Sequence, residues 1–130
     1  MNYSGLILND ITAAPGLCVS FFTQGCPHRC KGCHNPETWN FNGGKEFTSG
    51  TLDEIISGLT AQGIQRDLCI MGGEPLCDEN AFLTYLVIKE VKEAQIYAQA
   101  PEALGGISEK IQYYCYINED RGHLYNWILN

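Results

Sequence analysis

Three cysteines within eight consecutive residues limit what this chain can fold into more than any other feature of its sequence. They are Cys26, Cys30 and Cys33, in the spacing C-x3-C-x2-C. Thiolates at this spacing can bind three irons of a cubane 4Fe-4S cluster, whereas closed electron-carrying clusters take four cysteines. The sequence therefore predicts a metal centre with one open coordination position, which another group completes.

A zinc knuckle is the alternative use of these thiols. Cys30 and Cys33 would supply a C-x2-C half-site, and Cys26 with a histidine would complete a tetrahedron. However, His34 adjoins Cys33 and His28 lies inside the loop, which makes simultaneous ligation awkward. We therefore favour the iron-sulfur interpretation, and the zinc interpretation stays open.

The cysteine count bears on the cellular compartment. The chain has seven cysteines, an odd number that suits a disulfide framework poorly. Residues 1–4 carry neither the basic nor the apolar segment of a secretion signal. A chain of 130 residues can also bury a core without crosslinks. We expect reduced thiols and a cytoplasmic protein.

Composition narrows the partners. Eight basic residues against fifteen acidic ones give a net charge of -7, so the summed field repels phosphate backbones and anionic lipid surfaces. No apolar run approaches the roughly 20 residues that span a bilayer. We expect no nucleic-acid partner and no membrane role, and the length suits a single domain.

A first strand and a first helix surround the cysteine loop. The strand is expected over residues 17–22, directly before the loop. Thr51 and Glu54 predict a capping box at the start of the helix, and Gly63 predicts its end. The apolar face of this helix follows the spacing i, i+3, i+4, i+7, with Leu52, Ile55, Ile56 and Leu59.

A second strand and helix repeat this order. The strand is expected over residues 67–71 and the helix over residues 78–94. The buried side of the helix is expected to hold Leu83, Leu86, Val87 and Val91. Strand, helix, strand, helix predicts a parallel α/β sheet with right-handed crossovers. Because ligands collect at the carboxyl ends of parallel strands, the loops that follow the two strands should be neighbours.

The loop after the second strand is a Gly-Gly-Glu-Pro turn. Gly72 and Gly73 lack Cβ atoms, so the backbone of the turn can approach a ligand closely. Glu74 adds a negative charge that suits a substrate ammonium group, and Pro75 closes the turn. Such tetrapeptides are common turns, and only the cysteines and the preceding strand make this one indicative of a binding site.

The cysteine spacing resembles that of the radical S-adenosylmethionine (SAM) enzymes. Residues 21–25 before the cysteines and residues 34–41 after them are similar to glycyl-radical activases of the anaerobic ribonucleotide reductase type. The resemblance covers residues 1–92, and residues 93–130 are atypical. It implies an α/β fold that is a partial, open β/α barrel of the radical SAM type, shortened at the C-terminus, within one domain over residues 1–130.

The resemblance also implies cofactors and partners. Cys26, Cys30 and Cys33 would hold the 4Fe-4S cluster, and SAM would chelate its open iron. The residues implied in SAM binding are Gly32, Cys33, His34, Gly72, Gly73, Glu74 and Pro75. Reductive cleavage of SAM would give a 5'-deoxyadenosyl radical, which takes a hydrogen from a glycine of the large subunit of the anaerobic reductase. Flavodoxin is the kind of electron donor implied, and no conventional catalytic side chain is required.

The remaining cysteines have simpler interpretations. Cys18, Cys69 and Cys115 lie in expected strands, where they act as small buried hydrophobic residues. Cys77 follows the Gly-Gly-Glu-Pro turn, and we expect no catalytic role for it. Trp39 either packs in the loop or shields the cluster from solvent.

The C-terminal third gives the least information. It contains a Gly105-Gly106 break and an expected strand over residues 111–117, so only three or four strands are expected in all, with an exposed sheet edge. Three alternatives stay open beside the activase. They are an activase of the pyruvate formate-lyase type, a non-enzymatic iron-sulfur or zinc module, and an impaired homologue that only docks on the reductase.

Overall fold

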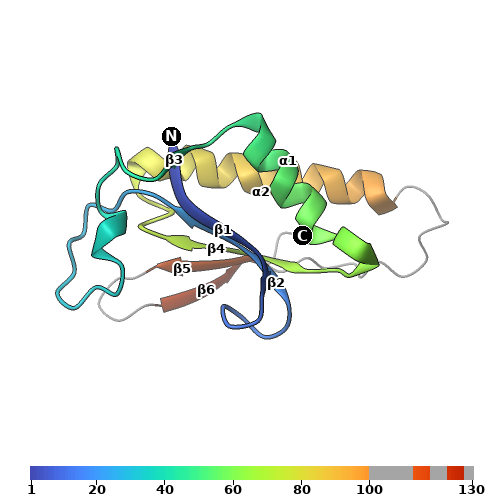
Figure 1. Ribbon diagram of the computed structural model, residues 1–130, viewed down its shortest axis with the longest axis horizontal. Helices are drawn as coiled ribbons and strands as arrows, with labels where there is room; N and C mark the ends of the chain where they lie inside the picture. Colours follow the sequence, from blue (N-terminus) through green and yellow to red (C-terminus); the bar gives the residue numbers. More distant parts are fainter. Residues whose placement is uncertain (100–112, 118–122, 128–130) are drawn as a thin grey trace.

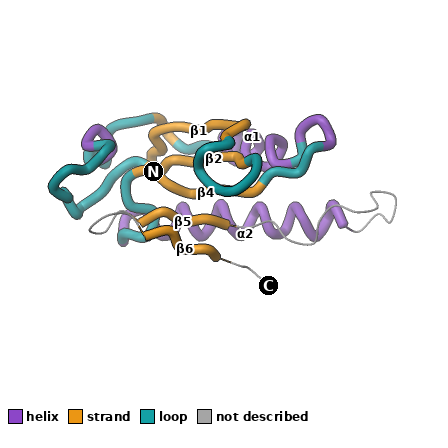
Figure 2. Tube along the Cα trace, turned by 90° about the horizontal axis from the view of Figure 1, so that it is seen from below, coloured by secondary structure: helices purple, strands orange, loops and turns teal. Residues whose placement is uncertain are grey.

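A single mixed sheet runs through the computed structural model, which describes residues 1–99, 113–117 and 123–127 (Figure 1). The strand order is β3-β1-β2-β4-β5-β6, and Figure 2 shows the five longer strands following one another across the sheet. The six described strands are β1 (Asn2–Asp10), β2 (Cys18–Thr23), β3 (Lys45–Glu46), β4 (Asp67–Gly72), β5 (Tyr113–Ile117) and β6 (His123–Trp127).

The sheet is mixed, and the expectation of a purely parallel sheet is wrong. β2 pairs with β4 and β4 with β5 in parallel, as predicted, but β1 lies antiparallel to β2 and β6 lies antiparallel to β5. Only a short loop joins β1 to β2, and such a loop permits an antiparallel neighbour without a crossover helix. The sheet has six described strands, whereas three or four are expected from the sequence. The sequence pattern does not predict β1, β3 and β6.

Two α-helices cover one face of the sheet (Figure 1). They are α1 (Ser49–Leu59) and α2 (Asp78–Gln99), and short 3-10 turns lie at η1 (Pro36–Thr38) and η2 (Ala61–Gly63). α2 runs five residues beyond its predicted end at residue 94. Among the described residues, neither helix combines the length and apolar character that crossing a bilayer requires.

The capping box of α1 lies one turn earlier than predicted. Thr48 is the N-cap, and its hydroxyl oxygen accepts a 3.4 Å hydrogen bond from the backbone N–H of Thr51. The Thr51 hydroxyl oxygen accepts one of 3.2 Å from the Thr48 N–H in return. The predicted pair of Thr51 with Glu54 is therefore wrong, and so is the predicted end at Gly63, because α1 stops at Leu59 before η2 begins.

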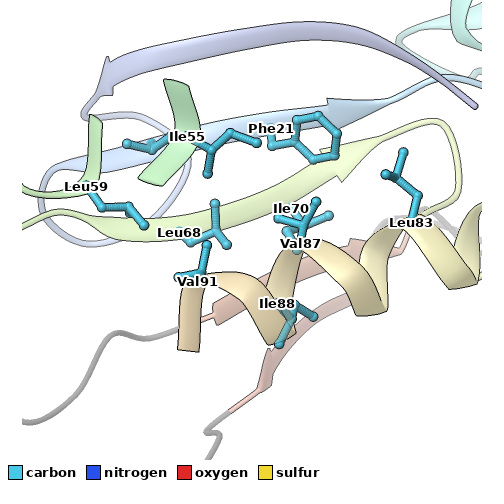
Figure 3. Close-up of a cluster of buried hydrophobic side chains, with 10 residues drawn as sticks. Phe21, Ile55, Leu59, Leu68, Ile70, Leu83, Val87, Ile88 and Val91 are labelled. Carbon is cyan, nitrogen blue, oxygen red and sulfur yellow. The ribbon is translucent and has the colours of Figure 1, made fainter. Parts of the chain in front are cut away.

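The core lies between the sheet and the two helices (Figure 3). Val19 and Phe21 of β2 point to the same side as Leu68 and Ile70 of β4, because alternate residues of a strand share a face. The helices contribute Ile55, Leu59, Leu83, Val87, Ile88 and Val91. Each fully buried side chain of this kind stabilises the fold by about 1.5–3 kcal/mol. Leu52, Ile56 and Leu86 are only half-buried.

The opposite face of β2 and β4 buries Cys18 and Cys69, as predicted. Burial raises the pKa of both thiols, which keeps them protonated and unreactive. Cys115 lies in β5 as predicted, and its side chain falls outside the described residues. The Gly105-Gly106 break and residues 111–112 of the predicted strand also fall outside the described residues.

Candidate metal centre

The strands β2 and β4 end level with each other, and this register brings the two predicted loops together. Thr23, the last residue of β2, pairs with Gly72, the last residue of β4. The Thr23 carbonyl oxygen accepts a 2.9 Å hydrogen bond from the Gly73 N–H, so the pairing continues into the turn. The predicted neighbourhood of the two loops is therefore confirmed, at the end of the sheet where both loops lie in Figure 1.

Two further hydrogen bonds fasten the turn to the start of the cysteine loop. The Glu74 backbone N–H donates to the Gly25 carbonyl oxygen at 2.9 Å. The buried Asn80 side chain donates to that same oxygen and to the Glu74 carbonyl oxygen, at 3.0 Å each. Sequence reasoning missed Asn80, since a single asparagine in the first turn of a helix carries no distinguishing pattern.

The two glycines of the turn are required by close backbone packing. Gly72 has a φ of 110°, a conformation that residues with a Cβ rarely adopt. A Cβ on Gly73 would collide with the Gly25 carbonyl group. The turn therefore lies directly against the cysteine loop, and any larger residue would push the two apart.

The C-terminal end of the cysteine loop, residues 38–40, is held to its N-terminal end by backbone and side-chain hydrogen bonds. The Gly25 N–H donates to the Thr38 carbonyl oxygen at 2.7 Å, and the Cys26 N–H donates to the Trp39 carbonyl oxygen at 3.3 Å. The buried Gln24 side chain donates to the Asn40 carbonyl oxygen at 2.7 Å. These contacts close residues 24–40 into a loop whose two ends are tied together.

The three cysteines line one cavity of about 140 Å³ between this loop and the turn. Gly72 and Gly73 form part of the opposite wall. His34 and Trp39 also line the cavity. The structure thus brings together six of the nine predicted site residues, namely Cys26, Cys30, Cys33, His34, Gly72 and Gly73.

The remaining predicted residues lie beside this cavity. Gly32 is exposed in the loop, and Pro75 is buried with its carbonyl oxygen accepting a 2.7 Å bond from the Thr84 hydroxyl. Glu74 is 3% exposed and lines a second hollow of about 460 Å³ together with His28 and Cys77. Glu74 therefore lines a different hollow from the one that the cysteines line.

The Glu74 carboxylate links the turn to the cysteine loop. Its Oε1 accepts a 2.9 Å hydrogen bond from the Leu76 N–H, which stabilises the turn. Its Oε2 lies 3.3 Å from Nε2 of His28, within ion-pair distance but without hydrogen-bond geometry. Burial raises the pKa of the nearby Cys77 thiol to about 11, which favours its protonated form at neutral pH.

The environment of Cys26 favours the thiol over the thiolate when no metal is bound. Burial raises the pKa of Cys26, a backbone hydrogen bond from His28 lowers it, and the Glu74 charge raises it further. A bound cation reverses this preference, because metal ligation requires the deprotonated sulfur. Metal binding by Cys26 would therefore release a proton.

Three cysteine thiols are a donor set that suits an iron-sulfur cluster. In the described ranges, no three side chains of His, Cys, Asp or Glu converge closely enough to hold one metal ion. A zinc site requires all its ligands within about 2.3 Å of one point. A cubane takes each thiolate on a different iron. Three thiolates also leave one iron for a ligand from outside the protein.

Comparison with known proteins agrees with this chemistry. A family model described as a 4Fe-4S single cluster domain matches residues 13–113. The chain belongs to the 4Fe-4S single cluster domain family. The matched range contains the cysteine loop and the Gly72–Pro75 turn, so the family assignment rests on the part of the fold that forms the cavity.

Several proteins that are similar to this chain share one name, anaerobic ribonucleoside-triphosphate reductase-activating protein. The protein of enterobacteria phage T4 is 41% identical over 80 residues, which are 62% of this chain and 51% of that protein. The Escherichia coli K12 protein is 40% identical over 81 residues (62% and 53%), and the Vibrio cholerae protein 34% over 93 residues (71% and 60%). The chain spans about half the length of the curated relatives it matches.

Proposed function

We propose that this chain is a radical SAM activase that generates a glycyl radical on anaerobic ribonucleoside-triphosphate reductase. One observation carries the proposal, namely that Cys26, Cys30 and Cys33 share a cavity with the Gly72-Gly73 turn. The name of the relatives supports the substrate protein. A three-thiolate donor set supports the reaction class, because it leaves an iron open to a small ligand.

The cysteines would hold a 4Fe-4S cluster in this cavity. When bound and reduced, the cluster supplies the electron that breaks a carbon-sulfur bond of SAM. The protein's own contribution is to position the thiolates and to limit solvent access. The hydrogen bonds that tie residues 24–40 to the turn serve the positioning.

The turn would bind SAM next to the cluster. Gly72 and Gly73 line the cysteine cavity, so their backbone groups are the nearest candidates for contact with the amino acid part of SAM. Glu74 would act from the adjoining hollow, and we expect Glu74→Ala to weaken SAM binding without removing iron. The proposed SAM residues are Gly32, Cys33, His34, Gly72, Gly73, Glu74 and Pro75.

Several finer expectations belong to the same proposal. The open sheet with both helices on one face would be part of an incomplete β/α barrel, in one domain over residues 1–130. The large reductase subunit would be the partner, and flavodoxin the electron donor. Thiolate ligands of this kind persist in reducing compartments, which supports a cytoplasmic location.

The test is an anaerobic assay on the reconstituted chain. With dithionite and SAM, we expect 5'-deoxyadenosine, and with the reductase added we expect a glycyl-radical signal by electron paramagnetic resonance (EPR). Cys30→Ala should abolish both products because two thiolates cannot hold the site-differentiated cluster. Cys69→Ala is the matched control, because Cys69 is fully buried in β4 and does not line the cavity.

The outcomes separate the alternatives. A cluster without SAM cleavage would indicate an electron carrier, and bound zinc would indicate a structural module. SAM cleavage without a radical on this reductase would favour a partner of the pyruvate formate-lyase type. The remaining rival is an impaired homologue that docks on the reductase. Docking without SAM cleavage would support that rival.

A further inference from the structure

The indole N–H of Trp39 is buried without a hydrogen-bond acceptor among the described residues. Trp39 lines the cysteine cavity, and its backbone is fixed on both sides. Its N–H donates to the Pro36 carbonyl oxygen at 3.2 Å, and its carbonyl oxygen accepts from the Cys26 N–H at 3.3 Å. The backbone of Trp39 is thus hydrogen-bonded to the backbone of Cys26, a proposed cluster ligand.

A buried donor without an acceptor is costly. Leaving such a group unsatisfied costs about 1–3 kcal/mol, and most buried polar groups in proteins have a partner. Within the part of the chain that the structure describes, the only other buried side-chain atom without a hydrogen bond is Oε2 of Glu74, which His28 approaches. The Trp39 N–H therefore requires an acceptor that the described residues do not provide.

The ring that carries this donor is also held in place. The Arg29 guanidinium lies over the Trp39 ring, with its Cζ 5.3 Å from the ring centroid. A cation at this distance is attracted to the face of the indole and restricts its rotation. It also withdraws electron density from the ring, which makes the N–H a stronger donor. Arg29 precedes Cys30 in the loop, and it contacts the cavity-lining Trp39 without lining the cavity itself.

We propose that the Trp39 Nε1–H donates a hydrogen bond to a sulfur atom of the bound cluster and thereby raises the cluster's reduction potential. This inference rests on the proposed cluster site. Cluster sulfurs carry negative charge that increases when the cluster gains an electron, so a donor stabilises the reduced form more than the oxidised form. Hydrogen bonds to the sulfurs are among the features that set these potentials.

Trp39→Phe tests the inference, because it removes the donor and keeps an aromatic ring under Arg29. We expect an unchanged iron and sulfide content and a cluster that is about tenfold harder to reduce, a shift of about -59 mV for one electron. The readout is an anaerobic redox titration followed by EPR. Trp127→Phe is the matched control, since it makes the same change on β6, two strands away from β4. Its potential should stay at the wild-type value.

A direct measurement covers the case in which Trp39→Phe fails to assemble a cluster. The chain has two tryptophans, so Trp39 is the only indole left in Trp127→Phe. With 15N-indole tryptophan in this variant, electron-nuclear double resonance of the reduced cluster should detect the nitrogen and its exchangeable proton. An equal potential in Trp39→Phe, or no indole coupling, would overturn the inference. A wild-type chain that binds no cluster would instead refute the proposed function.

Discussion

The backbone N–H of Glu74 donates a 2.9 Å hydrogen bond to the carbonyl oxygen of Gly25. This bond joins the turn after β4 to the residue that precedes the first cysteine. The level ends of β2 and β4 make it possible, because Thr23 and Gly72 are paired in the sheet. The cavity of the proposed cluster is therefore formed where two loops are joined, and changes at this joint should affect both stability and iron binding.

Gly73→Ala should separate the two loops. The added Cβ would collide with the Gly25 carbonyl group, and backbone on both sides leaves no flexible side chain to yield. Overpacking of this kind costs about 1–3 kcal/mol. We expect a lower free energy of unfolding in urea and less iron per chain after reconstitution.

Gly50→Ala is the control for this glycine substitution. Gly50 lies in the first turn of α1, where a Cβ would meet only the Thr48 hydroxyl oxygen at 3.5 Å. Alanine there should leave the stability unchanged or raise it by up to about 1 kcal/mol. Equal iron content in both variants would mean that the contact between Gly73 and Gly25 does not support the cavity.

Asn80→Ala should weaken the same joint from the helix side. Asn80 is 2% exposed, and its amide group donates to both the Gly25 and the Glu74 carbonyl oxygens. Removing a buried donor of two hydrogen bonds should lower the free energy of unfolding by about 1–3 kcal/mol. Asn42→Ala, at an exposed position in the loop, should change it by less than about 0.5 kcal/mol. Similar midpoints of urea unfolding for the two variants would contradict this role of Asn80.

Asp10→Asn should make stability less dependent on pH. One oxygen of the buried Asp10 carboxylate accepts 2.8 Å and 2.7 Å hydrogen bonds from the N–H and hydroxyl of Thr12, and the other accepts a 2.8 Å bond from the Ser20 hydroxyl. The backbone bond from Thr12 is the main cause that holds the pKa of Asp10 below 3.8, against the opposing effect of burial. The charged form is thus favoured in the folded state.

The sign of the pH effect follows from this lowered pKa. Stability from the Asp10 charge is complete above pH 3.8, the value in the unfolded chain, and is lost as the pH falls through the lower folded value. At neutral pH the variant should be less stable by about 1.5–3 kcal/mol, and the difference should shrink in acid. Urea unfolding at several pH values measures this difference in stability. Asp53→Asn, at an exposed position, is the control. A difference that grows in acid would refute the assignment.

Arg66→Met should destabilise the connection between α1 and β4. The Arg66 side chain is 2% exposed and carries a charge that backbone carbonyl groups satisfy. Its Nη1 donates to the carbonyl oxygens of Gly58, Ala61 and Ile64, at 3.2, 2.9 and 2.9 Å. Losing this donor leaves buried carbonyl groups without a hydrogen bond. We therefore expect the free energy of unfolding, measured in guanidinium chloride, to fall by about 2–4 kcal/mol.

Lys89→Met is the control for the loss of a cation. Lys89 is half exposed and lies 4.0 Å from Glu93 on the surface of α2. Exposed pairs of this kind contribute about 0–1 kcal/mol. If the free energy of unfolding fell by the same small amount in both variants, the buried guanidinium would contribute no more to stability than a surface charge does.

The meeting of the two loops is predictable from the sequence because it depends on a local pattern. Short apolar runs precede both the cysteines and Gly72, and parallel strands place their following loops at one edge of the sheet. Consecutive residues of β2 and β4 are buried, and a short continuous apolar run is the signal that identifies each strand. The cysteine spacing then identifies the chemistry.

Other parts of the fold depend on tertiary contacts that no local pattern encodes. The residues of β1 show no clear strand pattern in the sequence. They form a strand because they pair with β2. The roles of Asn80 and of the Trp39 N–H follow from burial and from neighbours far away in the sequence. The side chain of Glu74 is the clearest case, since the motif indicates a ligand contact but not that the carboxylate lies beside His28.

The central claim is that three cysteines hold a 4Fe-4S cluster with one iron open. The most direct test is EPR of the reconstituted, reduced chain before and after addition of SAM, together with metal and sulfide analysis. We predict about four irons and four sulfides per chain and a spectrum that changes when SAM is added. Zinc in place of iron, or an iron-sulfur spectrum that SAM leaves unchanged, would contradict the account.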